Sequence, residues 1–558
     1  MECRDISKMN TDNKKQRYCV NKIKKFIESD DELEGKILVL YGLRRTGKTT
    51  MMEQVISDYY SKKKCAFYEV TDKDNIDDIR DTIIFEQEKG TSIICFDEIT
   101  KAKDFITSSS ILPDIFAKEG MKIIVAGTDS LGFSFAEETE LFDRTERIRT
   151  THISFAEHCE ILGVKDIDDY IMYGGLMRKG ETDKKVYDYK SAKKYLDSAV
   201  SGNIASSIKN DPHNNELKKL SIEEIRSIVE KLVEIYSGSF NKEQMQEELK
   251  KVSVNGAIDL LAKSEYREYL KPVFLQKRDI TRDFTKVINA DTIISTEITD
   301  NMVLLFEQYL IDMDLLSAIN KKEFRYTDEF GWLESPTQKE FYIIQPAIKY
   351  HHLQKGKEFI ENEVYYQTLP QELKNKIQKK LDENIKGDMV EQIIIFDVSK
   401  ELSNSHYFVC KPEFYINGQK KGEYDMLIYD NEANKYWAFE IKHTTNPYYK
   451  QEQHLQNATL KEVIDSKYGN RENVCVLYRG NPFISSTGTL YFNITDFLVA
   501  MKKYKDVDTV FDYLSKGLSV KDISENTISK SNNFTQVTKN AKSIERRCGF
   551  HDDEWTKI

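Results

Sequence analysis

A glycine-rich segment with a lysine and three threonines has the spacing of a phosphate-binding loop. The pattern G-x-x-x-x-G-K-[ST] is formed by Gly42, Leu43, Arg44, Arg45, Thr46, Gly47, Lys48 and Thr49, with Thr50 directly after it. Glycines permit backbone conformations that turn successive N–H groups toward phosphate oxygens. Lys48 would bring a positive charge to the β- and γ-phosphates, and Thr49 would offer its hydroxyl to Mg²⁺. The sequence therefore predicts a site for ATP with Mg²⁺ as its cofactor.

Two acidic residues end a later apolar segment. Asp97 and Glu98 follow the run over 93–96. At the carboxyl end of a strand, Asp97 would hold Mg²⁺ and Glu98 would polarise the attacking water. The pair extends the prediction from nucleotide binding to nucleotide hydrolysis.

Polar residues further along leave two pairs of interpretations open. Thr128 would sense the γ-phosphate, or it simply caps the following helix. One of Arg144, Arg147 and Arg149 would act as an arginine finger, from the same chain or from a neighbouring subunit of a homo-oligomer. The alternative is a surface cluster that pairs with the acidic residues of 137–140.

A second group of acids lies near the C-terminus with a lysine. Asp425 opens one predicted strand, and Glu440 and Lys442 end the next. Residues two apart on a strand share a face, and a hairpin would bring Asp425 opposite them. Two carboxylates beside a lysine suit Mg²⁺-dependent phosphodiester hydrolysis, because the acids hold the cation and the lysine orients or deprotonates the nucleophile. Glu391, on a preceding helix, would supply a third acid. An exposed hairpin of alternating charges would show the same pattern.

The elements that must position these residues follow from hydrophobic periodicity. Over 36–155, apolar strands alternate with amphipathic helices, which predicts a parallel sheet covered on both faces. Residues 165–320 are mostly helical in pattern, and 323–345 resemble two short strands across a turn, compatible with a winged helix. From 388 to 492 a helix leads into alternating strands. The predicted fold class is therefore α/β, with a helical or winged-helix middle.

Composition excludes several classes of protein. The 558 residues are 40% hydrophobic and 31% charged, which is typical of a globular rather than a disordered chain. No apolar run approaches the ~18–20 residues of a membrane helix, and the N-terminus lacks a secretory signal, so we expect a cytoplasmic protein without a membrane partner. None of the eight cysteines forms a C-x-x-C pair, which excludes a zinc ribbon. A net charge of −11 argues against a nucleic-acid-coating protein but not against a local basic stretch such as 374–380.

Taken together, the motifs resemble prokaryotic AAA+-type ATPases with a C-terminal PD-(D/E)XK nuclease-like domain of uncharacterised role. The resemblance covers about residues 30–500, while 200–320 match loosely and 505–558 have no counterpart. The segments that carry it are VLYGLRRTGKTTMMEQV, FDEITKAKDF, IIVAGTDS, HISFAEHCEILG, DYIMYGGLM, IIQPAIKYHHL, GDMVEQIIIFDV, KKGEYDMLIYD with WAFEIKHT, and VCVLYRG with LYFNITDFL.

The resemblance implies both a domain order and a set of functional residues. The implied domains are an ATPase core (31–160), a helical or winged-helix middle (161–350) and a restriction-endonuclease-like α/β domain (351–500). Outside the resemblance, we expect a lead-in (1–30) and a polar tail (501–558). The implied site residues are Lys48, Thr49, Asp97 and Glu98 for nucleotide, Mg²⁺ and hydrolysis, Arg144 as the finger, and Glu391, Asp425, Glu440 and Lys442 in the nuclease-like site.

Three functions are compatible with these features. The first is an ATPase whose cycle is coupled to a nuclease-like domain acting on nucleic acid, with DNA favoured over RNA. The second is an ATP-dependent switch whose nuclease-like domain is inactive and only binds DNA or protein. The third is a signalling or defence switch without a nucleic-acid partner.

Overall fold

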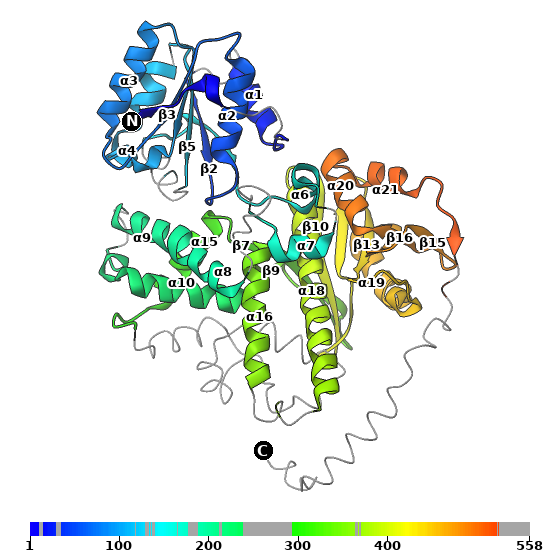
Figure 1. Ribbon diagram of the computed structural model, residues 1–558. Coiled ribbons are helices and arrows are strands. Elements are labelled where there is room, and N and C mark those ends of the chain that lie inside the picture. Colours follow the sequence, from blue (N-terminus) through cyan, green and yellow to red (C-terminus); the bar gives the residue numbers. More distant parts are fainter. Residues whose placement is uncertain are drawn as a thin grey trace.

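The computed structural model of the chain has three parts (Figure 1). An N-terminal α/β unit and a group of helices lie beside a C-terminal unit built on a long sheet. No helix among the residues that the structure describes is long and apolar enough to cross a membrane. Those residues are 1–9, 15–29, 35–117, 119–128, 133, 136, 140–164, 166–176, 188–210, 215–237, 293–362, 367, 370–521 and 523.

The N-terminal unit is a six-stranded sheet in the order β1-β3-β4-β5-β2-β6. Neighbouring strands are parallel except for β1 at one edge. The strands are β1 (Glu2–Cys3), β2 (Ile37–Tyr41), β3 (Cys65–Glu69), β4 (Ile93–Asp97), β5 (Lys122–Gly127) and β6 (Thr145–Arg149). The helices around them are α1 (Val20–Glu28), α2 (Lys48–Tyr59), α3 (Ile76–Glu88) and α4 (Phe105–Ser108).

Helices cover both faces of this sheet, as the apolar strands predict. Leu38 and Leu40 of β2 pack in one core with α1 and α2, whereas Ile37 and Val39 pack in another with α3. Strand β6 has no counterpart in the predicted elements. It is the edge strand, and among its residues only Ile148 is buried, so its sequence lacks the continuous apolar run of a central strand.

The middle of the chain is helical, as its periodicity predicts. Most of its apolar residues form one core, which includes Leu232 of α10 and Phe306 of α15, whereas Phe155 of α6 and Ile167 of α7 pack in the core of the C-terminal unit. Much of the predicted helical middle, 238–292, lies outside the described residues. The helices are α6 (Phe155–Leu162), α7 (Ile167–Tyr173), α8 (Tyr189–Tyr195), α9 (Ser201–Asn210), α10 (Ile222–Ser237) and α15 (Asp300–Asp312).

An eleven-stranded mixed sheet forms the C-terminal unit. Its main path runs β17-β15-β16-β14-β13-β12-β10-β7-β8, with β11 on β10 and β9 on β7. The strands are β7 (Leu316–Thr327), β8 (Gly331–Glu334), β9 (Gln338–Ile343), β10 (Tyr407–Ile416), β11 (Gln419–Glu423), β12 (Met426–Asp430), β13 (Lys435–Ile441), β14 (Asn470–Tyr478), β15 (Phe483–Ser485), β16 (Leu490–Asn493) and β17 (Val520–Lys521). The helices are α16 (Pro346–Asn362), α18 (Gln371–Glu401), α19 (Ala458–Tyr468), α20 (Ile494–Tyr504) and α21 (Val507–Ser515).

Two segments differ from the expected arrangement. Strands β7 to β9 do not form a separate winged helix, because β7 pairs in parallel with β10 and joins the C-terminal sheet. Phe324 and Phe414 stack across this pair with ring centroids 5.2 Å apart. The predicted polar tail begins with folded structure, since Val507 and Phe511 of α21 are buried in the C-terminal core. The other boundaries of the five segments expected from the sequence, from the lead-in to the polar tail, stay predictions.

Candidate functional site

The predicted phosphate loop connects the end of β2 to the start of α2. Gly42 and Gly47 have φ of +133° and +84°, which L side chains rarely adopt. A Cβ atom on Gly42 would lie 2.2 Å from the hydroxyl oxygen of Thr151. Gly42 is therefore required by both the turn and the close approach of residues 150–151.

The lysine of the loop is held inside it. Lys48 is 5% exposed, and its Nζ donates hydrogen bonds to the carbonyl oxygens of Gly42 (2.8 Å) and Leu43 (2.9 Å). Burial lowers the pKa of Lys48 to about 8, although Glu98 and Asp97 oppose this shift. The ammonium group is thus pre-positioned at the mouth of the loop, where a bound phosphate would replace the carbonyl contacts.

Asp97 and Glu98 lie at the same edge of the sheet as the loop. Strands β4, β5 and β2 are parallel neighbours, so their carboxyl ends meet there. The Thr49 hydroxyl donates to Asp97 Oδ2 at 2.6 Å, and the Thr128 hydroxyl donates to Glu98 Oε2 at 3.2 Å. Burial raises the pKa of Asp97, while its bond from Thr49 lowers it. Glu98 has a left-handed φ of +56°, a strained conformation that clusters at functional sites.

Arg144 lies at the other end of the sheet. The carbonyl of Arg144 accepts a hydrogen bond from Ile37 N, at the start of β2, whereas the loop follows the end of β2. Its side chain pairs with Asp114 (Nε–Oδ1, 3.3 Å) and donates to the carbonyl of Glu140. A finger role within the same chain does not fit this position, because a whole strand separates Arg144 from the loop. A finger role toward a neighbouring copy stays a prediction.

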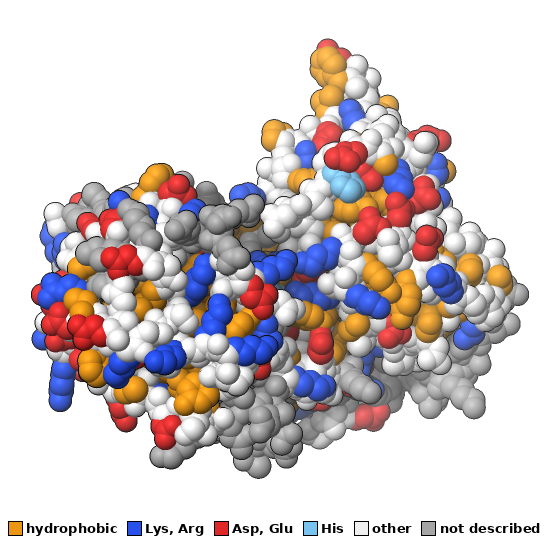
Figure 2. All heavy atoms as spheres, turned by 90° about the horizontal axis from the view of Figure 1, so that it is seen from above, with side chains coloured by type: hydrophobic (Ala, Val, Ile, Leu, Met, Phe, Trp, Pro, Cys, Tyr) orange, Lys and Arg blue, Asp and Glu red, His pale blue; other side chains and the backbone are white. Residues whose placement is uncertain are grey.

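A basic row joins β6 to the C-terminal helices. Arg149 and Lys400 both approach Asp314, at 2.8 and 3.9 Å, and Lys502 pairs with Glu401 at 2.6 Å. Burial lowers the pKa of Lys400 despite Asp314, and the charges of Arg149 and Lys502 lower it further. Seen from above, Lys and Arg side chains gather across the middle of the molecule (Figure 2). The row comprises Arg149, Lys400, Lys502 and Lys505 against the acids Asp314 and Glu401.

A buried ion pair beside the loop was missed by sequence reasoning. Arg17 Nε and Nη2 bind the two carboxylate oxygens of Glu157 at 2.9 and 3.0 Å. Arg17 Nη1 also donates to the carbonyl oxygens of Thr46 and Thr150, both at 2.6 Å. Glu157 lies in HISFAEHCEILG, one of the segments that carry the family resemblance. No motif indicates Arg17 in the polar N-terminal stretch. The pair ties three distant segments to the phosphate loop.

The second predicted group also comes together. Asp425 Oδ2 accepts hydrogen bonds from Ile441 N (2.7 Å) and Lys442 Nζ (2.8 Å). Lys442 Nζ contacts Glu440 Oε2 at 2.5 Å, and Glu440 Oε1 contacts His454 Nδ1 at 3.3 Å. Met426 pairs with Phe439 across the β12–β13 ladder, which places Asp425 opposite Glu440 as the hairpin predicts. Both carboxylates are buried, at 5% and 3% exposure.

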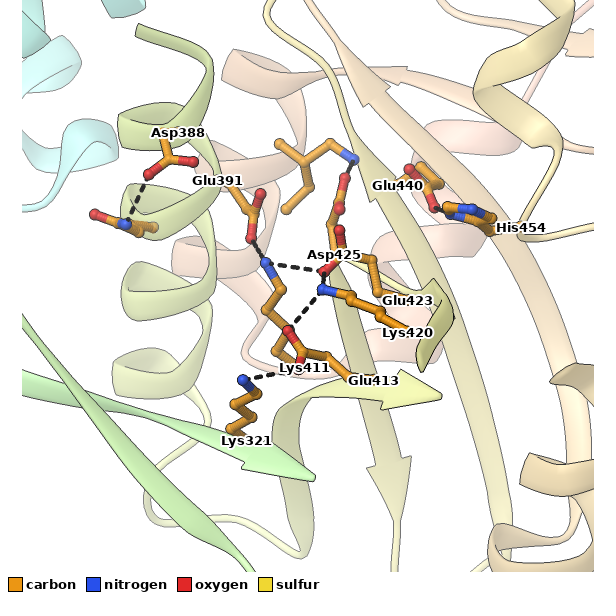
Figure 3. A network of polar contacts seen from close by, with 12 residues as sticks. Lys321, Asp388, Glu391, Lys411, Glu413, Lys420, Glu423, Asp425, Glu440 and His454 are labelled. Carbon is orange, nitrogen blue, oxygen red and sulfur yellow. Dashed lines mark hydrogen bonds and ion pairs between the residues drawn. The ribbon is translucent and has the colours of Figure 1, made fainter. Parts of the chain in front are cut away.

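Glu391 lies next to this group but binds a different lysine. It pairs with Lys411 of β10, which also lies 3.5 Å from Glu423 Oε2 (Figure 3). Burial raises the pKa of Glu391 to about 8; Lys411 opposes the shift and Asp425 adds to it. Burial raises the pKa of Glu440 as well. Lys411 was not among the predicted residues, because a single lysine on the preceding strand β10 carries no motif.

Lysines occupy the space between these carboxylates. Lys442 contacts Asp425 and Glu440, and Lys411 contacts Glu391 and Glu423. Within the part of the chain that the structure describes, no three His, Cys, Asp or Glu side chains are arranged to hold a metal ion. The predicted three-acid metal set of Glu391, Asp425 and Glu440 is therefore not assembled in this conformation.

Comparison with known families decides the identity of the N-terminal unit. Residues 34–159 match the family described as AAA domain. The match includes the phosphate loop, Asp97, Glu98 and Glu157. This part of the chain is a P-loop AAA domain. The match ends before α7, so the PD-(D/E)XK interpretation of the C-terminal sheet stays a prediction.

Several solved structures are similar to the chain at low identity. They are S. cerevisiae Hsp104 in its extended complex with casein (12% identity, 44% of this chain and 48% of that chain, TM-score 0.23), AMPPCP-bound DnaA from Aquifex aeolicus (13%, 52% and 86%, 0.21) and a DNA replication initiation factor (13%, 55% and 98%, 0.22). The chain spans about half the length of the Hsp104 chain. No curated protein matches it. The assignment of the AAA domain therefore rests on residues 34–159.

The AAA domain shares a cavity of about 620 Å³ with α9. Arg44, Glu98 and Thr128 line it from the AAA domain, and Asn203 and Ser206 line it from α9. Asn203 Nδ2 donates to the carbonyl of Thr128 at 2.8 Å, which holds the two walls together. Sequence reasoning did not indicate Asn203, since a single asparagine on a helix carries no motif.

Proposed function

We propose that the AAA domain binds and hydrolyses ATP, and that its cycle is coupled to action of the Asp425–Glu440–Lys442 group on nucleic acid. The observation that carries the first half is the convergence of Lys48, Thr49, Asp97 and Glu98 at one edge of the sheet. The second half is supported by two buried carboxylates beside one lysine.

Each residue of the proposed ATP site has its own role in hydrolysis. Lys48 would neutralise charge on the β- and γ-phosphates, in a buried setting that strengthens the interaction. The oxygens of Thr49 and Asp97 are hard donors 2.6 Å apart and fit Mg²⁺, which when bound would screen the phosphate charge. Glu98 would orient the attacking water and accept its proton. Thr128 holds Glu98 in place through its hydroxyl.

We expect ATP affinity to fall as the pH rises above about 8. Lys48 without phosphate has a pKa of about 8, and bound phosphate would raise that pKa, so binding takes up a proton in alkaline solution. Affinity is therefore full below pH 8, and log Kd rises by about one per pH unit above it. The last phosphate ionisation, near pH 6, lies below this window.

Calorimetry in two buffers of different ionisation enthalpy measures this proton uptake. We expect uptake close to zero at pH 7 and approaching one proton at pH 9. Equal values at the two pH values would contradict the assignment of Lys48.

The C-terminal group has the donors for phosphodiester chemistry. Asp425 and Glu440 offer hard oxygens suited to Mg²⁺, which would supply an activated water when bound. Lys442 pairs with both acids in this conformation, so it would have to leave them before Mg²⁺ binds and would then orient the nucleophile. The basic row supports a polyanionic partner, because its Lys and Arg side chains would attract phosphates.

A second candidate is a switch whose C-terminal domain binds nucleic acid without cutting it. The position of Lys442 between the two carboxylates favours this alternative, because an ammonium group there neutralises the acids without a metal. The candidates differ in whether Mg²⁺ produces cleavage.

Cleavage assays on the full chain separate the two candidates. With Mg²⁺, with and without ATP, we expect nicking of single- or double-stranded DNA, and less of RNA. Asp425→Asn and Glu440→Gln should each lower nicking at least about 10²-fold, since each removes a charged ligand. Glu432→Gln, an exposed acid in the turn of the same hairpin, is the matched control.

Two outcomes would overturn the nuclease proposal. Equal nicking by wild type and both variants would indicate a contaminating nuclease. Retention on DNA that weakens with added salt, without any cleavage, would establish the binding-only candidate instead.

A further inference from the structure

The segment after β6 is packed directly on the phosphate loop. Thr151 Oγ1 accepts a hydrogen bond from Leu43 N at 2.9 Å, and the hydroxyls of Thr150 and Thr46 lie 2.7 Å apart. All four residues are buried. A change in the loop backbone on phosphate binding would therefore act directly on Thr150 and Thr151, because both contact the loop.

The Arg17–Glu157 pair holds the same segment at the start of α6. Glu157 lies in the first turn of α6, and Arg17 connects it to the carbonyls of Thr46 and Thr150. Loop, β6 end and α6 are thereby held as one body.

The segment then contacts the helix that carries Glu391. Asp397 of α18 shares a hydrogen bond with His152 Nε2 at 2.6 Å and accepts another from Phe155 N at 3.0 Å. Asp397 is 4% exposed and lies on the same helix as Glu391. A shift of the segment would therefore displace α18 close to the second acidic group.

Helix α7 contacts the other flank of that group. Asp168 lies 2.6 Å from His443 Nε2 and 3.1 Å from Arg479 Nη1, and Lys386 of α18 approaches it at 3.8 Å. His443 directly follows Lys442. The segment thus contacts the C-terminal unit at two places, one at Asp397 of α18 and one at His443 beside Lys442.

We propose that residues 150–164 and 166–173, here called the connecting segment, transmit the nucleotide state of the phosphate loop to the C-terminal carboxylate–lysine group. Asp168 and Asp397 act as positioning residues: Asp168 sets the backbone around Lys442 through His443, and Asp397 sets α18. This rests on the ATP-binding half of the proposed function but not on nuclease activity. By linkage, the coupling acts in both directions.

Hydrogen exchange of the full chain tests the proposal. A non-hydrolysable ATP analogue should change exchange of the amides over 440–445 in the wild type. In Asp168→Asn that change should fall several-fold while the analogue still binds. Asp169→Asn, an exposed acid on the same helix, should behave as the wild type. Asp397→Asn provides an independent second variant, with the reduction expected over 391–397.

The outcomes distinguish the proposed ATP binding from the proposed coupling. Failure of the wild type to bind the analogue would overturn the proposed function. Binding with no change over 440–445, or an undiminished change in both variants, would overturn the coupling alone. A thermal unfolding curve of each variant confirms that it is folded, so that a lost response reflects coupling.

Discussion

Replacing Lys48 with alanine is expected to lower ATP hydrolysis by about 10³-fold or more. The reason is the position of its Nζ, buried in the loop within 2.9 Å of the carbonyls of Gly42 and Leu43. Among the described residues near the loop, Arg44 and Arg45 are exposed, and the buried Arg17 is bound to Glu157 and to the carbonyls of Thr46 and Thr150, so we expect none of them to replace Lys48 at the phosphates. Phosphate release under saturating ATP measures the effect.

Glu98→Gln separates binding from turnover at the same site. The amide keeps the size of the side chain but accepts no proton, so we expect ATP to bind normally and to remain unhydrolysed. Lys62→Ala, an exposed lysine outside the loop, is the control for loss of a positive charge. Unchanged hydrolysis in both Lys48→Ala and Glu98→Gln would refute the ATPase assignment.

The largest effect on stability is expected for Arg17→Met. The substitution leaves the carboxylate of Glu157 buried at 4% exposure without its partner, and removes the donor to Thr46 and Thr150. Breaking one side of a buried ion pair costs about 3–5 kcal/mol. Urea unfolding at pH 7 measures this loss. A destabilisation below about 1 kcal/mol, the range of exposed pairs, would contradict the buried bidentate geometry.

Adding Glu157→Gln to Arg17→Met provides the matched control. The double variant should recover part of the lost stability, because the uncompensated charge is gone. The pH dependence gives a further check. Burial would raise the pKa of Glu157, but Arg17 holds it below its ordinary value. The pair therefore stabilises the wild type above the ordinary carboxyl pKa, and that contribution is lost as the pH falls through the lowered one.

Local pattern was sufficient for the fold of the AAA domain. Continuous apolar strands predicted a parallel sheet with both faces covered, and the G-x-x-x-x-G-K-[ST] spacing placed Lys48 between strand and helix. Asp97 and Glu98 could be predicted at the same edge because parallel strands bring their carboxyl ends together. The hairpin register likewise predicted that Asp425 faces Glu440. These features depend on periodicity and on residues close in sequence.

Contacts between distant segments could not be predicted in this way. Arg144 follows the AAA strands closely in sequence, yet the parallel pairing of β6 with β2 places it at the end remote from the loop. Strand β7 pairs with β10 across 90 positions of chain, which no turn signal marks. Lys411 is close in sequence to Glu391 and Glu423, but no motif marks it, and only the packing of α18 against the sheet brings it to Glu391.

The sequence by itself therefore determined the position of the phosphate-loop motif between a strand and a helix, and which acids lie together at a strand end or across a hairpin. Tertiary structure alone decided that Arg17 is paired with Glu157, that lysines separate the C-terminal carboxylates, and that Asp168 and Asp397 connect the two sites. The physical reason is range. Hydrophobic periodicity and turn geometry act over a few residues, whereas ion pairs and sheet pairings between remote segments exist only once packing has excluded water around them.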